Sequence, residues 1–260
     1  MLSIRFCPRP LGIHFALSRA GQTGTPLQFF PARIAAIEAA TPSIRTLTLE
    51  IDDPAFRFLP GQWVELTVAI DGRPHTAGYS VTTSPLRRGR IELAVKASRT
   101  HPVAKWIHGQ ARVGERVQVS QGQGPFVYVP EMSDNLVLIG GGVGVTPLLA
   151  IFRHVRDAGL ATRVHLVYSV ADSREILFRD ELEAAARTHA NLRVSFTVTH
   201  PDADWHGASG RIDPAKLAAI DTPDDTLFYL CGPPGMVEDL SAMLHDRGVP
   251  MSRIIFEKWW

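Results

Sequence analysis

At 260 residues, the chain is long enough for one large domain or two modest ones, each with its own core. Its 45% hydrophobic and 20% charged residues are ordinary for a globular protein, and a formal net charge of +1 argues against nucleic acid or an anionic membrane as the main partner. Only Cys7 and Cys231 are present, which excludes a disulfide framework and a four-cysteine iron–sulfur cluster. No apolar run is long enough to span a bilayer.

The first stretch of the chain has an unusual charge pattern. Residues 1–37 contain four arginines and no acidic residue. Such a basic, serine-containing leader is typical of organelle transit peptides, and an unstructured extension or an over-long start explains it equally well. We therefore treat residues 1–30 as an extension outside the fold. We expect a cytoplasmic protein, with the mitochondrial matrix as the alternative if the leader is a transit peptide.

Residues 31–130 predict six antiparallel strands and one short helix. Apolar and polar residues alternate strictly within residues 46–51, 63–70 and 91–96, which is typical of half-buried strands. Turns are indicated at Pro60 with Gly61 and at Asp71 with Gly72. The remaining strands are expected at residues 33–37, 79–83 and 116–119, with a helix at residues 101–110. Six strands suffice for a small closed barrel.

Residues 131–260 follow a different pattern, in which strands and helices alternate. The strands are expected at residues 135–140, 163–170, 193–200, 226–231 and 253–256, and the helices at residues 147–158, 176–188 and 235–247. This alternation predicts a doubly wound parallel sheet. The boundary between the two domains is expected near residues 130–133.

A glycine-rich turn, GGGVGVTP, follows the first strand of the second domain at residues 140–147. Its glycines allow backbone to approach other backbone or a ligand closely. Thr146 suits a helix N-cap and Pro147 the first helical position, so a helix N-terminus is expected to face the turn and attract a phosphate. Val145 replaces the last glycine of G-x-G-x-x-G, so the turn alone indicates an anion site, and close packing is the alternative explanation.

Further candidate residues stand at the other strand ends, where open parallel sheets bind their ligands. The most specific group is CGPPGM at residues 231–236, because a cysteine and a Gly-Pro-Pro turn place a second helix N-terminus beside the first. A buried Cys231 would also be ordinary for a small apolar residue. The neighbouring strand ends carry Tyr168, Ser169, Asp172, Arg174, Thr199 and His200.

Several motifs together resemble the ferredoxin–NADP reductase superfamily over residues 32–260. GYSVTTSP, GGGVGVTP, CGPPGM and the terminal FEKWW occur in the order that this superfamily shows. AGYSVTTSP, RIELAVK, HPVAKWIH and FEKWW are more closely similar to the oxidoreductase NAD-binding domain-containing proteins. The resemblance implies an N-terminal six-stranded antiparallel flavin-binding β-barrel and a C-terminal doubly wound NAD(P)-binding domain, with hydride transfer at their junction.

On the flavin side, the resemblance implies roles for five residues. Tyr79 would lie along the flavin and the Ser80 hydroxyl near flavin N5, which suits a stacking surface and a hydrogen-bond donor. Val95 and Lys96 resemble the segment whose backbone meets the flavin. Gly124 resembles the glycine-rich segment that ends the barrel. Tyr79 closing a barrel end and Lys96 as a solvated charge are the ordinary structural alternatives.

On the nucleotide side, the resemblance implies that both turns and the neighbouring strand end bind the cofactor. The residues are Gly140, Gly141, Gly142, Val143, Gly144, Thr146, Pro147, Tyr168, Ser169, Arg174, Cys231, Gly232, Pro233, Pro234 and Met236. Ser80, Cys231, Glu257 and Trp260 would be catalytic. Trp260, or Trp259, resembles the terminal aromatic residue that covers the other flavin face, although two terminal tryptophans could instead fill a core or anchor a partner.

The sequence departs from the superfamily at the flavin phosphates. Ala77 replaces the arginine of Arg-x-Tyr-Ser, and THPVAKW at residues 100–106 replaces Gly-x-x-Ser/Thr. Losing one charge-assisted contact costs about 1.5–3 kcal/mol. The loss of both would leave flavin weakly held unless other residues compensate. The nearby cationic candidates are Arg73, Arg99, His101 and Lys105.

The sequence thus predicts a flavin-dependent NAD(P)H oxidoreductase, with FAD as the flavin and FMN as the alternative. Asp172 would bind a free ribose 2′-OH, whereas Arg174 and His200 would suit the 2′-phosphate of NADPH. We favour NADH, because Thr199 and His200 replace a Ser-Arg signature of NADP enzymes. Electrons would pass to an external protein or small molecule. The alternative function is a nucleotide-binding sensor or partner module with weak or no flavin binding.

Overall fold

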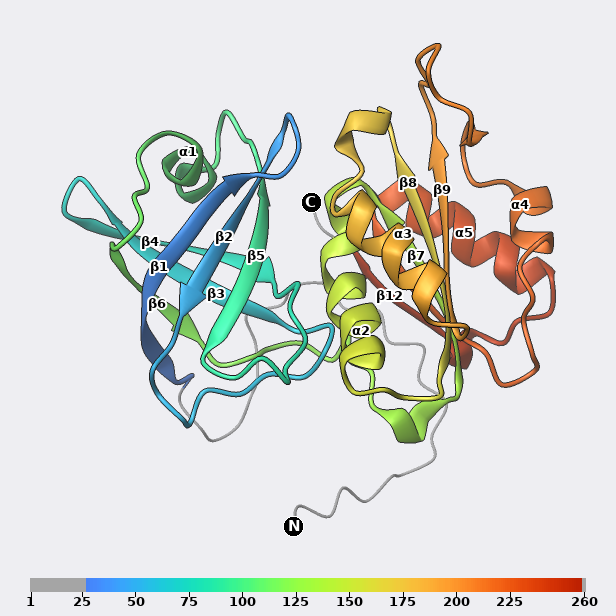
Figure 1. Ribbon diagram of the computed structural model, residues 1–260, viewed down its shortest axis with the longest axis horizontal. Coiled ribbons are helices and arrows are strands. Elements are labelled where there is room, and N and C mark those ends of the chain that lie inside the picture. The colour runs from blue at the N-terminus through green and yellow to red at the C-terminus, as the bar shows by residue number, and fades with distance from the viewer. Residues whose placement is uncertain (1–26, 259–260) are drawn as a thin grey trace.

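The computed structural model describes residues 27–258, which form two halves side by side (Figure 1). We call residues 27–129 the barrel half and residues 130–258 the parallel half. Their sheets have different topologies, one entirely antiparallel and the other entirely parallel. The prediction of two domains of different architecture, an antiparallel barrel followed by a doubly wound parallel sheet, is confirmed at the level of fold class.

The barrel half contains one six-stranded sheet in the order β4-β3-β6-β1-β2-β5. Its strands are β1 (Phe29–Ala39), β2 (Ile44–Glu50), β3 (Trp63–Ile70), β4 (Arg73–Ser80), β5 (Arg90–Lys96) and β6 (Arg116–Ser120). The sheet curls until its two edge strands approach, and a single bridge between Val81 and Leu93 joins them. Alternate residues of these strands, such as Leu47, Leu49 and Leu66, fill the interior.

Strand β4 is the main difference from the expected barrel. A strand was predicted at residues 79–83, but β4 ends at Ser80 and begins at Arg73, directly after the hairpin turn. Asp71 and Gly72 form that turn with φ angles of 50° and 74°, as the two-residue turns of hairpins require. The first residues of β4 are polar and include Pro74, so they lack the alternation that marks the other strands.

Two smaller features complete the barrel half. Strand β1 begins at Phe29, inside the region predicted to be an extension, while residues 1–26 of that extension lie outside the described residues. The predicted helix is α1 (Pro102–Gly109), which packs against β2, β4 and β5 through Val103, Ala104 and Ile107.

The parallel half contains a sheet in the order β10-β9-β8-β7-β11-β12. Its strands are β7 (Asn135–Gly141), β8 (Arg163–Val170), β9 (Leu192–Val198), β10 (Ala208–Ser209), β11 (Leu227–Gly232) and β12 (Ile254–Lys258). Its helices are α2 (Val145–Asp157), α3 (Arg179–Thr188), α4 (Pro214–Ala218) and α5 (Pro234–Asp246), with short 3₁₀ turns η1 (Pro130–Met132), η2 (Gly142–Gly144), η3 (Ser173–Glu175) and η4 (Met251–Arg253). Only the short elements α4 and β10 were not expected among the helices and strands.

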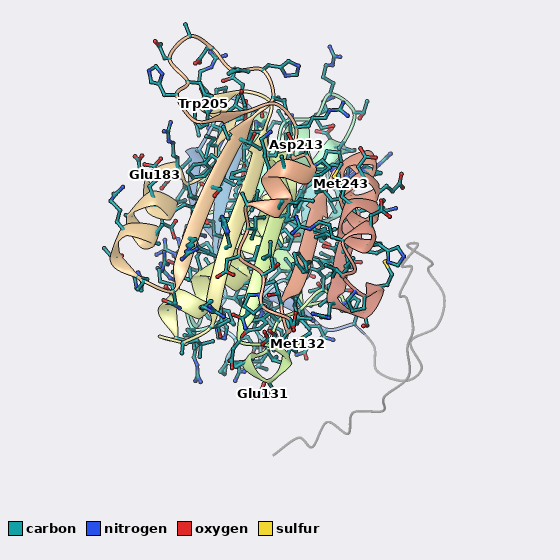
Figure 2. The ribbon with its side chains drawn as sticks, turned by 90° about the vertical axis from the view of Figure 1, so that its right-hand side faces the viewer. Glu131, Met132, Glu183, Trp205, Asp213 and Met243 are labelled. Carbon is teal, nitrogen blue, oxygen red and sulfur yellow. The ribbon has the colours of Figure 1, made fainter. Side chains whose placement is uncertain are left out.

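Helices cover both faces of the parallel sheet. Leu136 and Leu138 of β7 point into the cluster formed with α2 and α3, whereas Val137 and Ile139 point into the cluster formed with α4 and α5. This period of two explains why β7 is apolar on both faces. Figure 2 looks at this half from the side, with Trp205 beyond the carboxyl ends of the strands and Met132 near their opposite ends.

Helix α2 lies between the parallel sheet and the barrel half (Figure 1). Near its start, Val145 and Leu148 belong to the same buried cluster as Ile44 and Ala94 of the barrel half. A second link joins the halves, because the hydroxyl groups of Thr41 and Ser43 both donate to one carboxylate oxygen of Glu175, each at 2.7 Å. Among the described residues, no helix has the length and apolarity needed to cross a membrane.

Candidate functional site

The carboxyl edge of the parallel sheet brings most of the predicted nucleotide residues together. Cys231 on β11 is directly opposite Gly140 on one side and Glu257 on the other. Gly141 is opposite Ser169 in the next strand. Cys231 and Glu257, two of the residues predicted to be catalytic, are therefore neighbours in the sheet, with Cys231 fully buried and Glu257 half-buried.

Three glycines in the two turns are explained by contacts within the protein. A Cβ at Gly144 would lie 2.6 Å from the Cys231 carbonyl oxygen, and one at Gly141 would lie 2.4 Å from the Met236 sulfur. A Cβ at Gly232 would lie 3.1 Å from the Gly141 Cα. These glycines allow the turn after β7 to pack directly on the turn after β11.

Gly142 differs from the other glycines because it borders open space. Its φ angle is 54°, and a Cβ there would meet no atom within 4 Å. Val143 beside it is half-buried, Pro233 and Gly235 of the other turn are exposed, and Pro234 is half-buried. The accessible surface of the site therefore consists of the tips of the two turns, at the N-termini of α2 and α5.

The structure corrects the expected helix-capping roles of Thr146 and Pro147, while their contact with the nucleotide stays a prediction. Helix α2 begins at Val145 with Gly144 as its N-cap, two residues earlier than expected. The 3₁₀ turn η2 at residues 142–144 already winds the chain before the helix. The Thr146 hydroxyl donates to the Val143 carbonyl oxygen at 2.9 Å and is not a cap. Thr146 and Pro147 are both buried, so their side chains help to fix the turn.

Tyr168, which was predicted to contact the nucleotide, has its side chain in the protein core. Its side chain is fully buried and packs near Phe196. Its hydroxyl donates to the Glu175 carbonyl oxygen and accepts from the Leu177 amide, both at 3.4 Å, and burial raises its pKa. The side chain therefore supports the loop after β8 from inside the core and does not offer a surface to a ligand.

Asp172 and Arg174 lie in that loop and bind each other. The Asp172 carboxylate accepts from the Arg174 amide at 2.9 Å and from Arg174 Nε at 3.0 Å. These hydrogen bonds, first that of the side chain and then that of the backbone, lower the pKa of Asp172 to about 2. The charge of Arg174, which was predicted to meet a nucleotide, is thus neutralised by Asp172. In the same loop, the hydroxyl of Ser173 donates to a second carboxylate, Asp202, at 3.2 Å.

On the barrel side, polar side chains cluster at the end of β4. Ser80 is 6% exposed, and Tyr79 is half-buried with a pKa raised by burial. The Tyr79 hydroxyl and the Thr83 hydroxyl are both buried, and no described residue hydrogen-bonds either one. Unused buried hydroxyls on both sides of Ser80 match the polar edge and hydroxylated chain of a flavin, so this strand end fits FAD.

Of the other residues predicted to contact the flavin, Val95 and Gly124 already make contacts within the protein. The Val95 carbonyl oxygen lies 2.8 Å from His108 Nε2, and the Lys96 side chain is exposed. Gly124 has a φ angle of 92°, and a Cβ there would lie 2.8 Å from Trp63 Nε1. Gly124 is therefore required by its contact with Trp63, and the Val95 carbonyl is already used within the barrel half.

The position that lacks the phosphate-binding arginine lies in the barrel core. Ala77 is 8% exposed and belongs to the interior cluster. The four candidate replacements, Arg73, Arg99, His101 and Lys105, are all exposed. Helix α1, which carries Lys105, packs against the strand that carries Ala77. Lys105 is therefore carried by a neighbouring helix and not by β4, where the superfamily motif has its cation.

The terminal tryptophans are not described by the structure, and two polar residues near the site were not predicted. Trp259 and Trp260 lie outside the described residues. Sequence reasoning missed Thr83 and Arg153. Arg153 is 7% exposed and interrupts the apolar run of α2. A charge at a core position of a helix is the signal that could have identified it, since buried charges require partners.

Comparisons with known proteins identify the family. The model for the oxidoreductase FAD-binding domain matches residues 31–128, and that for the oxidoreductase NAD-binding domain matches residues 138–242. Oxidoreductase NAD-binding domain-containing protein 1 of Danio rerio is 36% identical over 94% of this chain and 97% of its own length.

Solved structures of similar fold include the Amycolatopsis cytochrome P450 reductase GcoB, with a TM-score of 0.80 and 25% identity over 94% of this chain and 73% of that one. A ferredoxin NADP+ reductase from Neisseria gonorrhoeae with bound FAD and NADP has a TM-score of 0.76 and 24% identity, covering 89% of this chain and 99% of that one. The chain, an NAD(P)H-dependent oxidoreductase with FAD- and NAD-binding domains, belongs to the family of oxidoreductase NAD-binding domain-containing proteins.

Proposed function

We propose that this protein uses NADH to reduce a bound FAD and then passes the electrons to an external acceptor. The observation that carries this proposal is the contact between the two halves. The glycine turn η2 lies against β5, and Val145 and Leu148 of α2 belong to the same buried cluster as Ala94 of that strand. The nucleotide-facing turn and the flavin-facing side of the barrel half are therefore adjacent.

Each side of this junction has residues suited to one cofactor. The open tips at Gly142 and Pro233 stand at two helix N-termini, where amide groups and helix dipoles favour the nucleotide pyrophosphate. The unused hydroxyls of Tyr79 and Thr83 favour the flavin beside Ser80. Bound together, the two cofactors supply the transfer of a hydride from the nicotinamide to the flavin.

The charges after β8 favour NADH over NADPH. With a pKa of about 2, the Asp172 carboxylate is ionised near neutral pH and can accept a hydrogen bond from a free ribose 2′-OH. Asp202 adds a second acidic group next to the same loop through its contact with Ser173. A 2′-phosphate would be repelled by these carboxylates, and Arg174 would have to leave Asp172 in order to bind it.

We infer that the acceptor is a separate redox protein or small molecule. Among the described residues, no group of histidine, cysteine and carboxylate side chains is arranged to hold a metal ion. The names of the similar structures, a cytochrome P450 reductase and a ferredoxin NADP+ reductase, support a protein acceptor. The acceptor would take electrons from the flavin edge that remains accessible when the nucleotide leaves.

The visible spectrum of the purified protein tests this function directly. We expect flavin absorbance after incubation with FAD, and NADH oxidation that requires both FAD and an artificial one-electron acceptor. NADPH should be oxidised more slowly, and FMN should support less activity than FAD. Absence of flavin absorbance and of flavin-dependent NADH oxidation would contradict the proposal and would favour a nucleotide-binding sensor or partner module.

A substitution at the predicted hydride site refines the test. Cys231 is fully buried and lies opposite Gly140 and Glu257 on the two adjacent strands. Cys231→Ala therefore removes only the sulfur atom and leaves the strand pairing in place. We expect slower flavin reduction with little change in flavin affinity, measured by rapid mixing with NADH and by flavin titration. If both quantities stay unchanged, the placement of the hydride site at Cys231 is wrong.

A further inference from the structure

Arg153 is a buried cation at the contact between the two halves. It lies on α2, seven residues after Thr146, and is 7% exposed. Residues seven positions apart lie on the same face of a helix, about 10 Å apart along its axis. The face of α2 that begins at the nucleotide turn therefore continues to Arg153.

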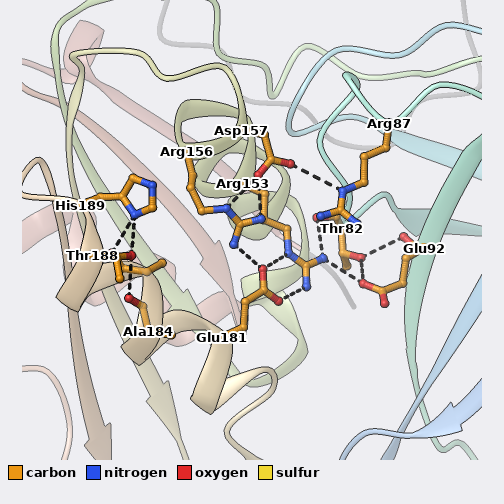
Figure 3. A network of polar contacts seen from close by, with 11 residues as sticks. Thr82, Arg87, Glu92, Arg153, Arg156, Asp157, Glu181, Ala184, Thr188 and His189 are labelled. Carbon is orange, nitrogen blue, oxygen red and sulfur yellow. Dashed lines mark hydrogen bonds and ion pairs between the residues drawn. The ribbon is translucent and has the colours of Figure 1, made fainter.

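The guanidinium group of Arg153 reaches into the barrel half (Figure 3). Its Nη1 donates to the Thr82 carbonyl oxygen at 3.0 Å and to Glu92 Oε1 at 2.9 Å. The same Glu92 oxygen accepts from the Thr82 hydroxyl at 2.6 Å, and the Thr82 amide donates to the Glu92 carbonyl oxygen at 2.9 Å. Arg153 thus binds both Thr82, which follows β4, and Glu92 of β5, at the place where these two residues hydrogen-bond each other.

The other donors of Arg153 are fixed by the parallel half. Its Nε and Nη2 donate to the two carboxylate oxygens of Glu181 on α3, at 2.9 and 2.6 Å. The ring of Phe178 lies beneath the guanidinium carbon, with its centroid 4.3 Å away. A bidentate contact and a stacked ring hold the planar group in one orientation, so its bonds to Thr82 and Glu92 have a fixed direction.

Thr82 and Thr146 give this contact its significance for the reaction. Thr82 follows Ser80 by two residues, and the Val81–Leu93 bridge ties that segment to β5. Thr146 belongs to the first turn of α2, beside the open glycine tip. The apolar contacts of Ile44 and Ala94 with α2 hold the halves together but are non-directional, whereas the hydrogen bonds of Arg153 fix both angle and register.

We propose that Arg153, acting through Glu92 and Thr82, is a positioning residue that sets the spacing between the nicotinamide turn and the flavin strand. This inference rests on the proposed function. Hydride transfer requires the donor and acceptor atoms to be nearly in contact, and a misplacement of about 1 Å can lower its rate about a hundredfold. A purely stabilising contact would instead affect unfolding and leave the rate of the bound complex unchanged.

Glu92→Ala tests the proposal without leaving a buried charge alone, because Arg153 keeps its contact with Glu181. We expect flavin reduction at saturating NADH to slow by roughly tenfold to a hundredfold, while the dissociation constants of NADH and FAD change less than about threefold. Arg153→Lys should slow the reaction by a smaller factor, because lysine keeps the positive charge but lacks the planar arrangement of several donors that arginine has.

Arg156→Ala is the matched control. Arg156 lies on the same helix and donates to the same Glu181, but its partners, Glu181 and Asp157, both belong to the parallel half. Asp157 meets the barrel half only through an ion pair of 3.6 Å with the exposed Arg87, and exposed pairs of this kind contribute little. Its flavin reduction rate should match that of the wild-type protein. In the protein without cofactors, hydrogen exchange at the Thr82 amide and the first turn of α2 should accelerate in Glu92→Ala and not in Arg156→Ala.

The outcomes separate this inference from the function on which it rests. Wild-type protein that binds both cofactors and does not reduce flavin would overturn the proposed function, and the inference with it. Wild-type protein that reduces flavin at the same rate as Glu92→Ala would overturn the inference alone. Equal slowing in Glu92→Ala and Arg156→Ala would also overturn it, because it would indicate general loosening of α2.

Discussion

The two halves of the molecule prepare for their ligands in different ways. In the parallel half, the two turns proposed to face the nucleotide already pack on each other through Gly141, Gly144 and Gly232. In the barrel half, the hydroxyls of Tyr79 and Thr83 are buried without a described partner. The proposed nucleotide site is therefore preorganised by contacts within the protein, whereas the proposed flavin site contains polar groups that no described residue satisfies.

This difference indicates where each half derives its stability. Close packing at the nucleotide edge contributes to folding whether or not a nucleotide is bound. Buried hydroxyl groups without partners cost free energy in the absence of ligand and favour binding when a ligand supplies hydrogen bonds. We therefore expect substitutions in the parallel half to affect folding, and substitutions at the end of β4 to affect folding and flavin binding in opposite directions.

The largest effect is expected from Gly144→Ala in the parallel half. The new methyl group would lie 2.6 Å from the Cys231 carbonyl oxygen and the Gly232 Cα, which are backbone atoms that cannot rotate away. Such overpacking costs about 1–3 kcal/mol. Urea denaturation should show this loss of unfolding free energy without any added nucleotide.

Gly235→Ala is the control for that substitution. Gly235 lies in the first turn of α5, and a Cβ there would meet nothing within 4 Å. Alanine is favoured over glycine in helices by about 0.5–1 kcal/mol, so this variant should be as stable as the wild-type protein or slightly more stable. Equal stability of the two alanine variants would show that the turns are not interlocked.

The same contrast explains how much of the fold the sequence could predict. The strands of the parallel half are short apolar runs between clear helical patterns, so β7, β8 and β11 lie within a residue or two of their expected positions. In the barrel half, β4 was misplaced because Arg73 to Gly78 is polar and contains a proline, and its pairing is set by the turn at Asp71 and Gly72. Local sequence patterns indicate which residues are buried. They do not indicate which neighbouring strand forms the backbone hydrogen bonds of a polar segment.

Side-chain contacts around the candidate site were predicted less well than strands, for a related reason. The residues that surround Cys231 could be foreseen because parallel strands place their ends at one edge of the sheet. The buried role of Tyr168, the early start of α2 before Thr146 and the partners of Arg153 depend on side-chain contacts between distant segments. No spacing within the sequence specifies those contacts.

Acid should weaken the parallel half through Glu181, with a smaller effect than Gly144→Ala. Burial alone would raise the pKa of Glu181, but hydrogen bonds and charges of Arg153 and then Arg156 outweigh burial and lower it. A carboxyl group with a lowered pKa stabilises the folded state above its ordinary pKa of 4.5. That stability is lost as the pH falls through the lower pKa of the folded state, at no more than about 1.4 kcal/mol per pH unit.

Urea denaturation at several pH values below about pH 5 would measure this loss. In Glu181→Gln, the unfolding free energy should be lower near neutral pH and should fall less steeply in acid. Glu183→Gln on the same helix is the control, because Glu183 pairs only with the exposed residues Arg179 and Arg187 among its described ion pairs. A slope that is the same in wild-type protein and Glu181→Gln would contradict a lowered pKa at Glu181.

The smallest effect, and the sharpest test of the flavin half, is expected from Tyr79→Phe. The substitution removes a buried hydroxyl that no described residue hydrogen-bonds, so the protein without flavin should be about as stable or up to about 1 kcal/mol more stable. FAD affinity should fall about threefold to tenfold if the flavin supplies the missing partner. Tyr229→Phe is the matched control, because the Tyr229 hydroxyl donates to the Val127 carbonyl oxygen at 2.8 Å, so its loss should lower stability and leave FAD affinity unchanged. If Tyr79→Phe lowers the stability of the flavin-free protein as Tyr229→Phe does, then the Tyr79 hydroxyl has a partner without flavin, and the contrast between the two halves is wrong.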